Sequence, residues 1–115
     1  MKLSVKDLVI PTKEIKVSGF KDTVTIYPIG GFALMKLKDL STKLAKDKED
    51  VEAQEECVRF ALKWGCKCSD EDIEYLIQND LIACIEITKE VIEYASEYNE
   101  TKLKESDLAK KKLKK

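Results

Sequence analysis

The chain has 115 residues, of which 43% are hydrophobic and 37% are charged, a balance typical of a single small soluble domain. The formal net charge of −1 conceals an uneven distribution, because residues 101–115 carry seven lysines against two acidic residues. That local charge of +5 leaves −6 on residues 1–100, which excludes the basic surface expected of a specific nucleic-acid binder. Because no stretch could span a bilayer and the N-terminus shows no signal-peptide pattern, we expect a cytoplasmic protein with no membrane partner.

The first thirty residues show the period-two alternation of a β-hairpin. Apolar and polar residues alternate in residues 14–18 (EIKVS) and again in residues 23–27 (TVTIY). The four residues between them, which begin at Gly19, predict a short hairpin loop. Leu8–Ile10 offers a short third strand that Pro11 would end. Since a lone hairpin is marginal in water, we expect helices to cover its apolar face.

From Phe32 the apolar period changes to that of a helix. Alanine and leucine recur at positions 33, 37, 40 and 44, which predicts a helix of about three to four turns. A second helix is expected over Val51–Trp64, after a charged linker at residues 46–50 and before a C-terminal Gly65. The sequence therefore predicts an α+β fold in which an N-terminal β-hairpin, with a third short strand as an option, packs against a C-terminal bundle of three to four helices.

Residues 68–99 carry the clearest helix signals. Ser69 occupies an N-cap position before three acidic residues, and Asn79–Asp80 interrupts the helix that they begin. A longer helix follows, whose apolar residues form two adjacent stripes: Leu81, Ile85, Ile92 and Ala95 on one, and Cys84, Ile87, Val91 and Tyr98 on the other. An apolar surface this wide indicates a helix that covers other elements.

The remaining segment, residues 101–115, has few apolar positions and many like charges. Such a composition favours a disordered tail over a frayed extension of the last helix. We therefore expect one α+β domain at residues 1–100 and a Lys-rich tail at residues 101–115.

The residues that most catalytic and metal sites need are missing. The chain has no histidine, which removes the usual catalytic triads and the commonest general base near neutral pH. Its cysteines, at positions 57, 66, 68 and 84, contain a C-x-C pair rather than C-x-x-C. A zinc site built from all four thiolates is the alternative, but two of the cysteines fall on apolar helix faces, where free thiols pack as small hydrophobes. The sequence predicts a protein that is not an enzyme and holds neither metal nor cofactor.

Three phrases of the chain resemble a known family. LSVKDLVIPTKEIKVSGFKDTVTIYPI, LSTKL and SDEDIEYLIQNDLIACIEITKEVIEYAS resemble phage tail assembly chaperones, specifically the XkdN-like group found in prophages of low-GC Gram-positive bacteria. The likeness covers about residues 2–97 and is one of layout and short phrases. It implies a non-enzymatic protein that binds the phage tape measure protein and helps to recruit tail tube subunits, and it leaves a homo-oligomer open.

Large residues at the edges of the apolar stripes are the candidate contacts for such a partner: Phe32, Met35, Trp64, Tyr94 and Tyr98. Aromatic side chains in such positions often anchor interfaces, although more often they pack in cores. The other function that the sequence leaves open is a small cytoplasmic adaptor or regulatory module that binds protein or nucleic acid. Genomic neighbours would separate the two, because a tail chaperone lies between the genes for the tail tube and the tape measure.

Overall fold

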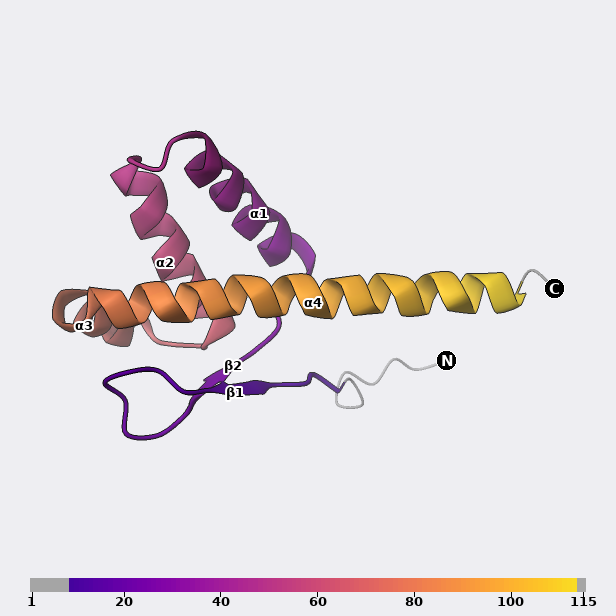
Figure 1. The fold of residues 1–115 in the computed structure, drawn as a ribbon, viewed down its shortest axis with the longest axis horizontal. Coiled ribbons are helices and arrows are strands. Elements are labelled where there is room, and N and C mark those ends of the chain that lie inside the picture. The colour runs from indigo at the N-terminus through magenta and orange to yellow at the C-terminus, as the bar shows by residue number, and fades with distance from the viewer. Residues whose placement is uncertain (1–8, 114–115) are drawn as a thin grey trace.

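The chain forms a two-stranded hairpin followed by four helices in the part that the structure describes (Figure 1). This computed structural model describes the backbone of residues 9–113 and the surroundings of side chains in residues 9–106. The elements are β1 (Lys13–Ile15), β2 (Val24–Ile26), α1 (Gly31–Lys46), α2 (Val51–Gly65), α3 (Asp70–Asn79) and α4 (Leu81–Leu113). The predicted α+β fold, with strands first and helices after, is confirmed.

The hairpin is antiparallel, and its strands are shorter than the sequence predicts. The ladder pairs Lys13 with Ile26 and Ile15 with Val24. It stops there because the Phe20 N–H donates to the Val17 carbonyl at 3.2 Å, so that the chain turns two residues after β1. The third strand expected at Leu8–Ile10 is absent from the described Val9 and Ile10, which are exposed, while Leu8 lies outside the described residues.

Glu14 links the two strands on the solvent-exposed face of the hairpin. Its carboxylate accepts hydrogen bonds from the hydroxyls of Thr23 and Thr25, each at 2.7 Å. These bonds, from Thr25 first and then Thr23, hold the pKa of Glu14 below its ordinary value because they favour the charged carboxylate.

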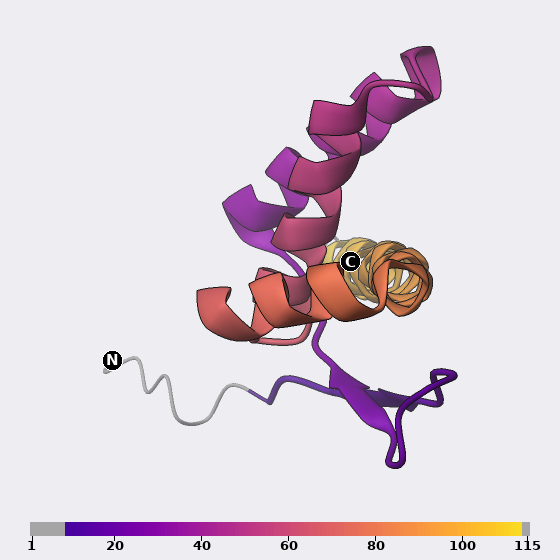
Figure 2. The same ribbon diagram turned by 90° about the vertical axis from the view of Figure 1, so that its left-hand side faces the viewer.

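The helices α1 and α2 form an antiparallel pair on one side of α4, and the hairpin lies on the other side (Figures 1 and 2). Leu37 and Leu40 of α1 are buried, as the helical period predicts. Between the two layers, α4 contributes the buried residues Ala83, Cys84, Ile87, Val91 and Ala95. The core therefore runs from α1 and α2 through α4 to Ile15 and Ile26 of the hairpin.

Two hydrogen bonds fix the hairpin layer to the helices. The Tyr27 N–H donates to the carbonyl of Gly65 at 2.7 Å, where α2 ends. The side-chain amide of Asn99 donates to the carbonyl of Ile29 at 2.9 Å, just before α1 begins. The segment between β2 and α1 is thus held against α2 and α4.

Beyond Asn99, α4 continues away from the rest of the molecule (Figure 1). Its backbone is helical through Leu113, whereas the sequence favoured disorder from residue 101. Residues 101–106 are exposed. The domain boundary near residue 100 stays a prediction.

Candidate partner-binding groove

An apolar groove of about 660 Å³ lies between α1, α2, α3 and the first half of α4. Its apolar lining comes from all four helices: Leu44 of α1; Val51, Cys57 and Val58 of α2; Ile77 of α3; and Leu81, Ile85 and Ile92 of α4. Gln54, Glu55, Thr88 and Lys89 are the polar residues of the lining. The volume is in the range of ligand-binding pockets, and the surface is largely hydrocarbon.

The groove exists because α4 has more apolar surface than the core can cover. Cys84, Ile87 and Val91 of the second stripe are buried, and so is Ala95 of the first. The rest of the first stripe faces the groove, where 51% of Leu81 and 42% of Ile85 remain exposed to solvent. Exposed apolar residues that gather in one hollow, rather than singly, indicate a surface for interaction.

Two helix starts place the residues at the mouth of the groove. The Asp50 carboxylate accepts the Ala53 N–H at 3.1 Å, so α2 begins at Val51, which is exposed on the rim. The Asp80 carboxylate accepts the Ala83 N–H at 3.1 Å, so α4 begins at Leu81. Both caps are local features of the sequence, and together they bring two distant apolar residues to one hollow.

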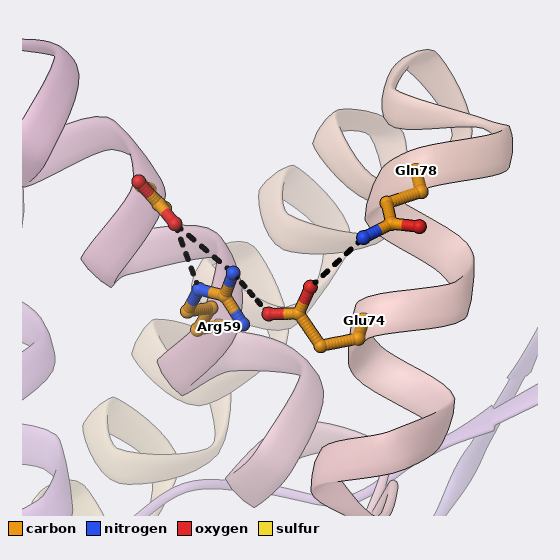
Figure 3. A network of polar contacts seen from close by, with 4 residues as sticks. Arg59, Glu74 and Gln78 are labelled. Carbon is orange, nitrogen blue, oxygen red and sulfur yellow. Dashed lines mark hydrogen bonds and ion pairs between the residues drawn. The ribbon is translucent and has the colours of Figure 1, made fainter.

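A polar network holds α3 against α2 (Figure 3). The guanidinium of Arg59 donates a hydrogen bond from Nη2 to the carboxylate of Glu55 on its own helix, at 3.0 Å, and forms an ion pair with Glu74 of α3. Glu74 also accepts a weak hydrogen bond from Gln78 at 3.4 Å. The hydrogen bonds that Arg59 donates to Glu55 and, with a smaller effect, to Glu74 raise the pKa of Arg59, which therefore stays charged.

The polar atoms among the groove's lining side chains offer little chemistry. The Thr88 hydroxyl donates to the Cys84 carbonyl at 2.7 Å and is thereby occupied. Burial raises the pKa of the Cys57 thiol, so this thiol stays neutral near pH 7. The groove is therefore built to bury apolar surface, with its charged groups confined to the edge.

That edge is acidic on the side of α2. Residues 47–56 contain six acidic side chains and one lysine. Asp50, Glu52, Glu55 and Glu56 line a shallow hollow of about 400 Å³ beside the groove, and Glu55 borders both. The two positive groups in this hollow are already paired, Lys43 with Asp39 and Arg59 with its glutamates. A segment that reaches this edge thus meets unbalanced negative charge.

None of the five residues that the sequence singled out lines the groove. Phe32, 89% exposed, and Met35 lie on the first turns of α1. Trp64 is half exposed at the end of α2, with its ring centroid 6.1 Å from that of Phe60. Their roles in binding stay predictions.

The two tyrosines are half-buried on α4 and make other contacts. The Tyr94 hydroxyl donates to the Pro11 carbonyl at 2.9 Å, which holds the segment before β1. Tyr98 packs beneath the ammonium group of Lys102, 5.7 Å from its ring centroid. The aliphatic groove residues were not singled out by the sequence, although the excess width of the apolar surface on residues 81–98 was a signal for them.

Comparisons of the chain with protein-family models, with curated proteins and with solved structures return no match. Within the described residues, no helix is long and apolar enough to cross a membrane. The same part of the chain contains no group of three or more His, Cys, Asp or Glu side chains arranged to hold a metal ion. The groove is consequently the feature on which a functional proposal can be built.

Proposed function

We propose that this chain is a non-enzymatic tail assembly chaperone of a phage or prophage, which holds an amphipathic helix of the tape measure protein in the groove between α2 and α4. The observation that carries the proposal is the largely apolar lining, with Leu81 and Ile85 half exposed. A helix laid with its apolar face into such a groove is a recurrent mode of recognition.

The dimensions of the groove suit a helix. Its lining on α4 extends from Leu81 to Ile92, a rise of about 16 Å, which matches about three turns of a partner helix. A partner stripe of residues spaced i, i+3, i+4 and i+7 would fill this length.

Charge complementarity defines the partner further. The acidic edge formed by Asp50, Glu52, Glu55 and Glu56 favours a helix that carries lysine or arginine beside its apolar stripe. Such pairs at an exposed rim raise the association rate more than the affinity, and salt weakens them. The proposed occupant of the groove is therefore a basic amphipathic helix.

The identity of the partner rests on the resemblance of residues 2–97 to tail assembly chaperones. Tape measure proteins of such phages are long, with apolar helices that would aggregate. A chaperone that covers the apolar surfaces of those helices keeps the tape measure protein soluble in the host cytoplasm. Recruitment of tail tube subunits is the second part of the role that the resemblance implies.

The test is co-expression with the tape measure protein encoded by the same phage or prophage genome. We expect the unmodified chain to increase the soluble fraction of the tape measure protein, and Ile85→Glu to abolish that increase. Burying a glutamate in place of isoleucine removes apolar contact and adds a charge, a loss of about 2 kcal/mol or more, which is roughly thirtyfold in affinity. Ile82→Glu is the matched control, because Ile82 is 73% exposed on the same helix and lies outside the groove.

The outcomes separate the function from the site. A tape measure protein that is equally insoluble with and without the unmodified chain contradicts the tail-chaperone function. Equal effects of Ile85→Glu and Ile82→Glu contradict the groove as the site. The Trp64→Ala variant tests whether this exposed aromatic residue contributes to binding of the tape measure protein. Circular dichroism of each variant checks that it folds.

A further inference from the structure

The turn between α2 and α3 holds two cysteines close together. The backbone N–H groups of Cys66 and Cys68 both donate to the carbonyl of Leu62, each at 3.2 Å. Lys67 between them has a φ of 56°, and it is the single non-glycine residue with a positive φ in the described part of the chain. A left-handed residue brings the Cα atoms of its two neighbours to about 5.5 Å, as two steps along a helix do, and this separation is within the range of disulfides.

The two thiols leave the same turn and influence each other. A hydrogen bond from Cys66 to Cys68 raises the pKa of the first thiol and lowers the pKa of the second. Both residues are partly buried against the core, whereas Cys57 and Cys84 are fully buried. A reagent in solution therefore meets this pair before the other two cysteines.

Three contacts stabilise this turn. The Gly65 carbonyl accepts the Tyr27 N–H at 2.7 Å, and the ammonium of Lys67 lies 4.3 Å from the centroid of the Tyr27 ring. On the other side, the Ser69 hydroxyl accepts the Asp72 N–H at 3.2 Å and starts α3. A left-handed conformation costs a residue with a side chain roughly 1 kcal/mol or more, so these contacts stabilise the turn that carries the two cysteines.

We propose that Cys66 and Cys68 form a reversible thiol–disulfide site, which low-molecular-weight disulfides such as oxidised glutathione convert to a disulfide within the turn. The site is separate from the groove, so its test does not depend on the proposed chaperone function.

The two thiols have different roles in this exchange. The hydrogen bond from Cys66 lowers the pKa of Cys68 to about 7, against an opposing effect of burial and of Asp72. The same hydrogen bond, with burial, raises the pKa of Cys66. Cys68 is therefore a thiolate in a large fraction of molecules near neutral pH, and it is the attacking group.

The exchange proceeds in two balanced steps. The Cys68 thiolate attacks one sulfur of oxidised glutathione, and a glutathione thiolate leaves, so that Cys68 carries a mixed disulfide. Cys66 then loses its proton and attacks the Cys68 sulfur, which releases the second glutathione. The two protein thiols are oxidised by two electrons, and oxidised glutathione is reduced to two molecules of glutathione. Excess reduced glutathione reverses both steps.

The experiment uses the full chain in its folded state with oxidised glutathione as the probe. We expect the intact mass to fall by two hydrogen atoms, with no glutathione retained, and to recover on addition of reduced glutathione. Digestion after lysine and before aspartate then separates residues 64–67 from residues 68–69 and from the peptide that holds Cys84. A product in which the first two peptides remain linked identifies the Cys66–Cys68 bond.

Two variants test the assigned roles. Cys66→Ser should accumulate glutathione on Cys68, because the second step is blocked. Cys68→Ser should react with oxidised glutathione roughly tenfold more slowly, because the remaining Cys66 thiol is mostly protonated. Thiols that stay reduced in the unmodified chain, a bond to Cys84 instead, or equal rates in the two variants would each overturn the proposal.

Discussion

The end of α2 approaches α4 closely at Gly65, a residue without a side chain. A Cβ atom added to Gly65 would lie 2.6 and 2.7 Å from the two terminal methyl carbons of Val91, which is fully buried. The sequence predicts Gly65 as a helix stop, and the helix does end there. Its role in packing depends on which residue of α4 crosses it, and that is not a local property of the sequence.

Gly65→Ala should therefore destabilise the fold, although alanine favours helices. We expect a loss of about 1–3 kcal/mol in the free energy of unfolding, because Val91 has no free space into which to move. Chemical denaturation measures this loss. Gly30→Ala is the control, since its Cβ would meet the Asn99 side chain at 3.8 Å, an ordinary contact. Equal stability of the Gly65→Ala variant and the unmodified protein would show that α2 and α4 pack less closely than described.

At the scale of elements, the start of α4 depends on one carboxylate. Asp80 ends α3, with its N–H donating to the Leu76 carbonyl at 2.8 Å, and its side chain caps α4. Asp80→Ala should cost about 1 kcal/mol, while Asp80→Asn should retain most of the stability because an amide oxygen also caps. Thermal unfolding compares the three proteins. An alanine variant as stable as the asparagine variant would mean that the cap contributes nothing.

The local signals of the sequence explain why these elements could be predicted. Ser69 and the Asn79–Asp80 break were recognised because capping requires particular side chains at fixed offsets from a helix start. The strands are shorter than predicted because the turn closed by the hydrogen bond between Val17 and Phe20 ends the pairing of β1 with β2. The alternation of apolar and polar residues continues past the last paired residue and therefore does not indicate where the turn begins.

The groove, by contrast, could not be predicted from any one segment. Its lining joins Leu44 and Val51 to Ile77 and Ile85, and these residues meet only because the four helices that carry them pack together. The sequence showed that α4 has two apolar stripes, but it did not show which of them the core covers. The large residues at the edges of the stripes, which the sequence favours as contacts, lie on α1, at the end of α2 and on α4 outside the aliphatic groove.

At the scale of the whole molecule, α4 is much longer than the body that it supports. It has 33 residues, about 50 Å of helix, and the part beyond Asn99 extends past the other elements (Figure 1). Near this point, the side-chain amide of Asn99 donates one hydrogen bond to the Ile29 carbonyl, which joins α4 to the segment before α1. The same amide also donates to the Ala95 carbonyl within α4. Leu103 is exposed, as are the other residues from 101 to 106.

Truncation after Glu100 should consequently leave the fold nearly as stable as before. We expect the melting temperature to stay within a few degrees, because the part of this segment whose burial is described, residues 101–106, is exposed, and changes at exposed positions alter the free energy of unfolding by about 0.5 kcal/mol. Asn99→Ala is the informative comparison, since it leaves the Ile29 carbonyl without its partner and should cost about 1 kcal/mol or more although only one side chain changes. If truncation instead lowers the melting temperature more than Asn99→Ala does, the segment beyond residue 100 packs against the domain, and the domain boundary at that residue is wrong.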